Sequence, residues 1–226
     1  MIITIDGPVA SGKSSVAKAL AQRIGAYHVN TGLLYRAVAY ILIHDFHITD
    51  LKKLARQDPA DFDFIYALSY VFINHMPQIR YGEKDITPFL IRHKELDNGA
   101  SLVSALPPVR ERLLPVQQAI GKQYSIVADG RDCGTVVYPH ADIKIFLTAT
   151  LTARAQRVAH ELQQKTGKEQ NLQEIEELIA TRDKRDVTRP VAPLCKAPDA
   201  YLFDNSDLTL EQTVDHLDAY IQQKKH

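Results

Sequence analysis

The chain has 226 residues, which is enough for one domain or for one domain with insertions. Its 27 Lys and Arg residues equal its 27 Asp and Glu residues, so the overall charge gives no case for a nucleic-acid or membrane partner. Cys133 and Cys195 are too few for a disulfide framework, and the nine histidines show no metal-ligand spacing. No apolar run reaches transmembrane length, and the chain opens directly into a strand rather than a signal peptide, so we expect a soluble cytoplasmic protein.

Short apolar segments alternate with helical patterns along the chain. The predicted strands, mostly β-branched and without polar alternation, are 2–5, 27–29, 125–128, 143–147 and 201–203. The predicted helices are 14–24, 33–44, 109–123, 153–164 and 210–223. Thr209 and Gln212 have the spacing of a capping box for the last helix. This alternation predicts an α/β fold with a five-stranded parallel sheet, whose ligands bind at the carboxyl ends of the strands.

A glycine-rich segment, Gly-Pro-Val-Ala-Ser-Gly-Lys-Ser at 7–14, follows the first strand. It matches the pattern G-x-x-x-x-G-K-[ST] in full, and the helix after it is closed by Gly25. Backbone N–H groups of such a loop surround phosphate oxygens, and the helix N-terminus adds partial positive charge. Lys13, which we expect on a solvent-facing loop, supplies a cation for the β- and γ-phosphates. A chance match in a turn would not explain the strand and the helix on either side, so this loop is predicted to bind a nucleotide.

Polar turns follow the second and third strands. Thr31 stands where it would cap the next helix, and the sequence leaves open whether it caps, contacts a ligand or does both. Asp129 ends the third strand, where an acid beside the glycine-rich loop can hold magnesium or its water shell. An Asx turn would explain Asp129 and Gly130 but not the added Arg131 and Asp132.

An insertion interrupts the alternation between the second helix and the third strand. It is roughly eighty residues long, much more than a β-α-β connection needs. The aromatic and β-branched stretch 62–81, followed by a turn at 81–86, predicts a small subdomain of antiparallel strands with helices. Its last helix is expected to begin at Pro107-Pro108, with a kink or a new start at Pro115.

A polar segment, 165–193, forms the second interruption. We predict a helix at about 172–181, followed by the charged run 182–189 and by Pro190, an arrangement that suits a mobile lid. Arginines lie here, near strand ends and near glycine turns, where they could clamp phosphates bidentately. They are Arg36, Arg110, Arg131, Arg182, Arg185 and Arg189. For any one of them the alternative is a solvated surface arginine in a weak ion pair.

Taken together, these segments resemble the bacterial cytidylate kinases, the CMP/dCMP kinase branch of the nucleoside monophosphate kinases, over essentially the whole chain. The matching pieces are ITIDGP…SGK at the start, TG..YR at 31–36, NGAS…P.VR at 98–110, DGRD.GTVV..A at 129–141, the strand KIFL.A, RD.RD..R.VAPL at 182–194, and A.DA with an acid after the last strand. Two of these pieces, DGRD.GTVV and RD.RD..R.VAPL, are specific to that family, and a generic P-loop match would not supply them. Asn30 stands where the family usually has an acid, and Ser14-Ser15 replaces its usual Gly-Thr.

The resemblance implies a monomeric P-loop kinase that transfers the γ-phosphoryl group of ATP to CMP or dCMP in pyrimidine nucleotide metabolism, with Mg2+ as cofactor. It implies one domain at 1–226, with a core at 1–44, 109–164 and 194–226, a monophosphate-binding insert at about 45–108 and a lid at about 165–193.

The resemblance also implies roles for individual residues. The implied ATP-binding residues are Gly7, Pro8, Val9, Ala10, Ser11, Gly12, Lys13, Ser14 and Ser15. The implied CMP-binding residues are Arg36 and Arg131 for the phosphate, Thr31, Ser101, Arg110, Asp132 and Arg189 for the cytosine, and Arg182 and Asp186 for the sugar. The implied catalytic residues are Lys13, Asp129, Arg131, Arg182 and Arg185. The metal would be held by Asp129, directly or through water, and by Ser14 or Ser15; the sequence leaves open which hydroxyl faces it.

The sequence leaves alternative functions to be weighed. The nearest is another small-molecule P-loop kinase, for UMP, AMP or shikimate. A GTPase-like switch is disfavoured because the chain lacks N-K-x-D for guanine, and its arginines suit a second substrate. A non-catalytic nucleotide sensor is disfavoured because Lys13 and Asp129 are both present.

Overall fold

The structure is a computed structural model that describes residues 1–48, 50, 51, 54, 58–92 and 95–224. It divides into two compact units. Unit 1 comprises Met1–His28 and Ile126–His226, and unit 2 comprises Val29–Ser125.

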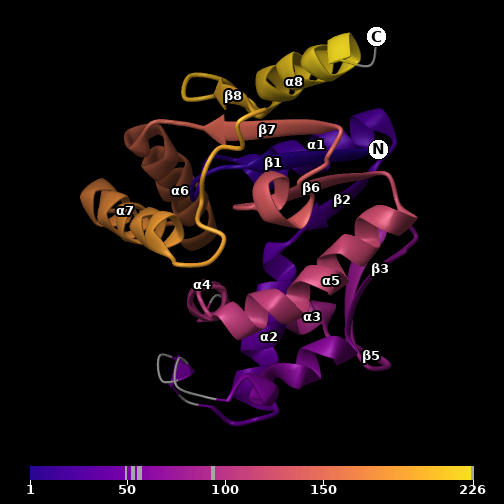
Figure 1. Cartoon of the computed structure of the whole chain (residues 1–226). Coiled ribbons are helices and arrows are strands. Elements are labelled where there is room, and N and C mark those ends of the chain that lie inside the picture. The colour runs from indigo at the N-terminus through magenta and orange to yellow at the C-terminus, as the bar shows by residue number, and fades with distance from the viewer. Residues whose placement is uncertain (49, 52–53, 55–57, 93–94, 225–226) are drawn as a thin grey trace. The chain divides into compact units, whose positions relative to one another are not determined.

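A five-stranded sheet forms the centre of the core. Its strands are β1 (Ile2–Asp6), β2 (Tyr27–Asn30), β6 (Ile126–Gly130), β7 (Ile143–Thr148) and β8 (Tyr201–Asp204), in the order β2-β6-β1-β7-β8 (Figure 1). The pairs β1–β6, β1–β7 and β7–β8 are parallel. The predicted five strands and the α/β class are therefore confirmed. In parallel strands the carboxyl ends meet at one edge, so Asp6 and Gly130 pair side by side there.

Two helices of unit 1, α1 (Lys13–Ile24) and α8 (Leu210–Lys224), pack on this sheet. Their buried residues and those of the strands form one apolar cluster that includes Ile3, Leu20, Ile145 and Leu217. Gly25 ends α1 in the left-handed conformation, as its place after the apolar pattern predicts. The predicted capping box of α8 is also present, because Thr209 and Gln212 exchange side-chain to backbone hydrogen bonds.

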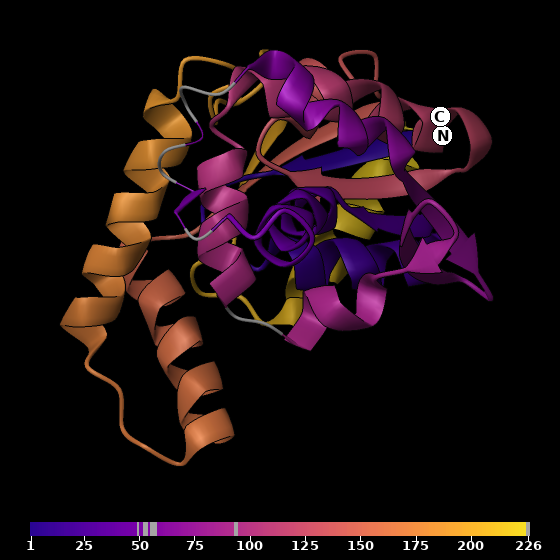
Figure 2. The same cartoon turned by 90° about the horizontal axis from the view of Figure 1, so that it is seen from below.

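A helical hairpin, α6 (Leu151–Thr166) and α7 (Leu172–Thr188), also belongs to unit 1. The two helices lie side by side and bury a small apolar cluster around Ala155, Ile175 and Ile179 (Figure 2). The helix predicted at 172–181 runs seven residues further than expected. Arg189 ends it by donating its N–H to the carbonyl of Arg185, immediately before Pro190.

Unit 2 contains a second sheet, which is antiparallel. Its strands are β3 (Leu68–Ile73), β4 (Met76–Tyr81) and β5 (Lys84–Asp85), and its helices are α2 (Gly32–His44), η2 (Pro59–Ala67), α3 (Thr87–Arg92), α4 (Glu95–Val103) and α5 (Pro107–Gln123). The predicted turn at 81–86 joins β4 to β5, with Gly82 in the left-handed conformation. The antiparallel strands and helices that were predicted for this stretch are thus present. The new helix start expected at Pro115 is wrong, because Pro115 lies inside one continuous α5.

Within the part of the chain that the structure describes, no helix is long and apolar enough to cross a membrane.

Candidate active site

The glycine-rich loop runs between the end of β1 and the start of α1. A side chain at Gly7 would overlap the carbonyl oxygen of Leu147 on β7, so only glycine fits there. Gly12 has a φ of +86°, which favours glycine, and it caps the helix that starts at Lys13. The loop therefore presents the N-terminus of α1 to a ligand, which is the arrangement that binds phosphate.

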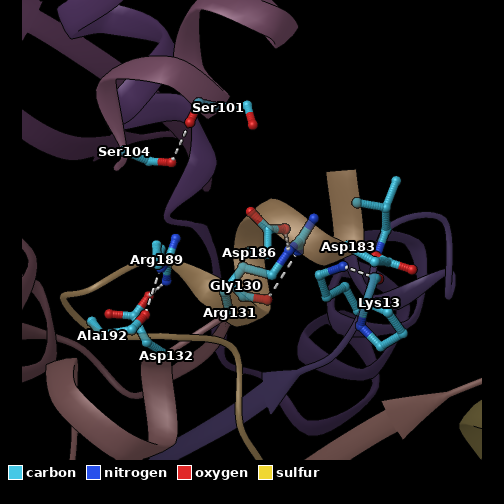
Figure 3. Close-up of polar contacts among 12 residues, drawn as sticks. Lys13, Ser101, Ser104, Gly130, Arg131, Asp132, Asp183, Asp186, Arg189 and Ala192 are labelled. Carbon is cyan, nitrogen blue, oxygen red and sulfur yellow. Dashed lines mark hydrogen bonds and ion pairs between the residues drawn. The ribbon is translucent and has the colours of Figure 1, made fainter. Parts of the chain in front are cut away.

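Lys13 is buried in this loop, which corrects the expectation that it lies on a solvent-facing segment. Its ammonium donates to the carbonyl oxygen of Pro8 at 2.8 Å (Figure 3). Burial, reinforced by the charge of Arg131, lowers the pKa of Lys13 well below its ordinary value of 10.5, and Asp129 opposes this shift. A polyanionic ligand would compensate the buried charge.

A hydroxyl and a carboxylate meet beside the loop. Ser14 Oγ donates to Asp129 Oδ2 at 2.6 Å, and His28 Nε2 lies 2.6 Å from Asp129 Oδ1. Asp129 is buried near the end of β6, whereas Ser15 is exposed. His28 lies on β2, which is next to β6 in the sheet. The sequence prediction missed His28, because its contact with Asp129 depends on the order of the strands in the sheet.

Two acid–arginine pairs join the turn after β6 to the end of α7. Arg131 Nε donates to Asp186 Oδ2 at 2.6 Å, and Arg189 donates to Asp132 Oδ1 at 3.1 Å (Figure 3). Arg189 also donates from Nε to the carbonyl oxygen of Ala192 at 2.6 Å. Asp132, Asp186 and Arg189 are all buried. The structure thus brings together four predicted site residues from two distant segments of the sequence.

The two remaining predicted arginines of unit 1 lie on α7. The charge of Arg182 acts on Lys13 and lowers its pKa further. Arg185 is half-buried in the last turn of the same helix.

Arginines of α6 hold the glycine-rich loop from outside, and the sequence prediction did not include them. Arg154 donates to the carbonyl oxygen of Val9 at 2.9 Å and to the carboxylate of Asp183. Arg157 donates to the carbonyl oxygens of Ser11 and Asn205. Their spacing of three on a helix directly after β7 was the available signal, because such residues share one helix face.

The predicted residues of unit 2 have their own partners. Arg36 donates to Asp97 Oδ1 at 2.8 Å. Arg110 donates to the carbonyl oxygen of Ser104 at 3.0 Å, and its guanidinium lies 5.4 Å from the ring centre of Tyr35. Ser101 is buried, and its carbonyl oxygen accepts the hydroxyl of Ser104 (Figure 3).

Thr31 occupies the cap position of α2, but its side chain makes no capping hydrogen bond. Asn30 Oδ1 instead accepts the N–H of Gly32 at 2.9 Å. Of the alternatives that the sequence left open for Thr31, capping by its hydroxyl is not seen, and Asn30 performs that local role.

Among the described residues, no group of three or more His, Cys, Asp or Glu side chains could hold a metal ion. A ligand set for a metal would therefore have to include other oxygens, such as the Ser14 hydroxyl.

Known proteins resemble this chain over nearly its whole length. The family model described as cytidylate kinase matches residues 3–223. The chain is 41% identical to the cytidylate kinase of Protochlamydia amoebophila (strain UWE25), over 95% of this chain and 93% of the relative. It is 42% identical to that of Azotobacter vinelandii (strain DJ / ATCC BAA-1303), over 96% and 93%. The crystal structure of an uncharacterized protein from Eubacterium ventriosum ATCC 27560 has the same fold, with a TM-score of 0.52 and 18% identity over 99% of this chain and 98% of that one. The chain belongs to the cytidylate kinase family.

Proposed function

We propose that the protein transfers the γ-phosphoryl group of MgATP to CMP or dCMP, giving ADP and CDP or dCDP, in pyrimidine nucleotide metabolism. The observation that carries this proposal is the pairing of Asp132 with Arg189 and of Arg131 with Asp186 beside a complete phosphate-binding loop. The loop suits a triphosphate donor, and the paired acids and arginines suit a second, smaller nucleotide.

The donor is held by residues 7–15. Backbone N–H groups at the start of α1 and the ammonium of Lys13 surround its phosphates. Because Lys13 is buried beside Arg131 and Arg182, bringing in the triphosphate relieves the repulsion among these cations. This coupling favours binding of the donor over binding of less charged ligands.

The Ser14 hydroxyl and the Asp129 carboxylate fit Mg2+, because both offer hard oxygen donors and they lie 2.6 Å apart. Since Ser15 is exposed, Ser14 is the better candidate of the two serines. Bound Mg2+ would neutralise charge on the phosphates of ATP. His28 orients Asp129 from the side opposite Ser14, because each partner contacts a different carboxylate oxygen.

The acceptor is recognised by side chains that act only as hydrogen-bond donors or only as hydrogen-bond acceptors. Cytosine has an amino donor at N4 and acceptors at N3 and O2. Asp132 is an acceptor when ionised, and Arg110 and Arg189 are donors only. Thr31 and Ser101 complete the base site, Arg36 and Arg131 hold the phosphate, and Arg182 and Asp186 contact the sugar.

Catalysis proceeds by positioning and by charge neutralisation. The acceptor phosphate attacks the γ-phosphoryl group directly, and Lys13, Arg131, Arg182 and Arg185 stabilise the charge that spreads over its oxygens. No covalent enzyme intermediate and no general-base histidine take part.

We further propose an insert at about 45–108 that binds the monophosphate and a lid at about 165–193. The antiparallel strands β3 to β5 fall within that insert, and α7 lies within the lid, in support of this division. The enzyme is proposed to act as a monomer in the cytoplasm, without nucleic-acid partners. Its balanced charge is consistent with this setting, as are its two cysteines, which form no disulfide with each other.

The experiment that tests the function is ADP release with MgATP and each nucleoside monophosphate in turn, and with shikimate. We expect turnover with CMP and dCMP, and a lower kcat/KM with UMP and AMP. Preference for AMP, UMP or shikimate, or no turnover with any acceptor, would contradict the proposal.

A further inference from the structure

We propose that Asp6 is a positioning residue for the acceptor nucleotide: its carboxylate fixes the turn that carries Arg131 and Asp132 against the end of β1. This inference rests on the function proposed above. Asp6 has no part in the set of substrate-binding residues given there.

The carboxylate of Asp6 binds two consecutive backbone N–H groups. Asp6 is the last residue of β1 and is 4% exposed. Its Oδ1 accepts the N–H of Cys133 at 2.8 Å, and its Oδ2 accepts the N–H of Gly134 at 2.7 Å. One carboxylate therefore fixes both the distance and the orientation of this turn, which a single hydrogen bond would not do.

The anchored turn is continuous with the residues that would contact CMP. The carbonyl oxygen of Asp132 accepts the N–H groups of Val136 and Val137, so Asp132 begins the single helical turn η3 (Cys133–Val137). A displacement of Cys133 and Gly134 would therefore carry the backbone of Asp132 with it. The hydrogen bond between Asp132 and Arg189 would then be broken, because its atoms are already 3.1 Å apart and a small increase in this distance exceeds hydrogen-bond length.

The turn also lies directly on β1. A Cβ atom at Gly134 would be 2.8 Å from Thr4 Oγ1, and 3.3 Å from both Asp6 Oδ2 and Lys144 Cδ. The hydroxyl of Thr4 is buried and makes no hydrogen bond within the described residues. Of these two neighbouring polar side chains on β1, Asp6 therefore holds the turn and Thr4 only lies beneath it.

Stability alone does not explain a carboxylate at this place. Burial raises the pKa of Asp6 to about 6, and the charge of Asp132 adds to this, whereas the two N–H groups and Lys13 only partly oppose it. Ionised Asp6 therefore costs folding free energy near neutral pH. The carboxylate is therefore needed to keep the turn with Arg131 and Asp132 in position for the acceptor nucleotide.

Asp6→Asn tests the proposal, with Thr4→Val as the matched control. Asn keeps the volume of Asp but turns one N–H donor toward a backbone N–H, so one of the two bonds is lost. We expect the KM for CMP to rise by about tenfold or more, whereas the dissociation constant for an ATP analogue measured without CMP changes by less than about twofold. Thr4→Val removes only the unbonded hydroxyl, and we expect both constants to stay within about twofold of wild type.

Gly134→Ala provides a second variant in case Asp6→Asn does not fold. It pushes the turn away from β1 while the carboxylate remains, and it should raise the KM for CMP in the same selective way. The proposal is overturned if these variants leave the KM for CMP within about twofold of wild type, or if they weaken ATP and CMP binding equally. Failure of the proposed function would be seen differently, as wild-type protein that releases no ADP with CMP.

Discussion

The carboxylate of Asp183 accepts the backbone N–H of Val9 at 2.9 Å, so helix α7 is hydrogen-bonded directly to the glycine-rich loop. Arg154 completes this link, because it donates both to the carbonyl oxygen of Val9 and to Asp183. The position of α7 and the shape of the loop are therefore coupled. Arg182 and Asp186 lie on the same helix, so this link also sets where they stand.

Asp183→Asn should loosen α7 in the ligand-free protein. The amide can still accept from Val9, but the ion pair with the buried Arg154 is lost, which costs about 1–3 kcal/mol. We expect amide hydrogen exchange at 182–189 to become about tenfold faster or more. Glu176→Gln is the control, because Glu176 is on the same helix and accepts a hydrogen bond from the exposed Thr152 hydroxyl.

Wild-type protein should show the reverse effect with a bisubstrate inhibitor. A lid that closes over the phosphates gives slower exchange at 182–189 when the inhibitor is bound. Equal exchange with and without the inhibitor would mean that the segment is not a lid. Equal exchange in Asp183→Asn and wild type would mean that the ion pair between Asp183 and Arg154 does not stabilise the position of α7.

The sequence predicted what depends on local pattern. The loop at 7–14 is one contiguous motif, and the five strands were apparent because most of them are short apolar, β-branched segments without polar alternation. Contacts that depend on strand order were missed. His28 reaches Asp129 only because β2 lies beside β6, and Asp183 reaches Val9 only because α7 folds back along α6. Composition does not specify either arrangement.

Burial of functional groups was also outside what the sequence could show. Lys13 was expected on a solvent-facing loop, but it is buried, and charges of the turn after β6 and of α7 act on it. Thr31 was a candidate helix cap by type and position, yet the neighbouring Asn30 takes the hydrogen bond. Both cases depend on which side chains lie nearby in the folded protein, and residue type and spacing do not determine this.

Lys13→Met should abolish turnover without destabilising the ligand-free protein. The side chain is buried, and its charge is disfavoured there, so replacing it with an apolar chain of similar length removes an electrostatic cost. Loss of the cation at the transferred phosphoryl group should lower kcat/KM by at least about a hundredfold. The measurements are steady-state kinetics and the melting temperature.

Lys18→Met is the control, because Lys18 is exposed on the same helix. It should leave both quantities near their wild-type values. If Lys13→Met keeps more than about a tenth of wild-type kcat/KM, the transition state does not depend on this ammonium.

The free energy of unfolding should depend on pH because Asp6 titrates. Its folded pKa, about 6, is above the ordinary value of 3.8, so the fold favours the protonated acid. The stabilisation from protonated Asp6 is complete below about pH 4 and is lost as the pH rises through 6, by about 3 kcal/mol in total. Residue 6 does not titrate in Asp6→Asn, so this variant does not lose that stabilisation. Its free energy of unfolding should therefore rise relative to that of wild type as the pH increases over this range.

Urea unfolding of both proteins at several pH values between about 4 and 7 measures this difference, in which the other titrating groups cancel. A difference that stays constant with pH would mean that the folded pKa of Asp6 is ordinary.

Asp132→Asn should reduce the discrimination between CMP and UMP. Uracil has an acceptor at O4 and a donor at N3, the reverse of cytosine, so it faces an ionised carboxylate with the wrong polarity. Asn can turn its N–H donor toward O4. Because Asp132 is buried against Arg189, the lost charge should also cost CMP activity, by about tenfold to a hundredfold in kcat/KM.

The measurement is kcat/KM for CMP and for UMP at saturating MgATP, and we expect the CMP/UMP ratio to narrow. Asp199→Asn is the control, because Asp199 is an exposed acid of unit 1 that pairs with Lys144 and should leave the ratio unchanged. If Asp132→Asn lowers activity equally for both acceptors, the ratio stays at its wild-type value. Asp132 would then serve only to hold Arg189 in place, and recognition of the base would have to come from other residues.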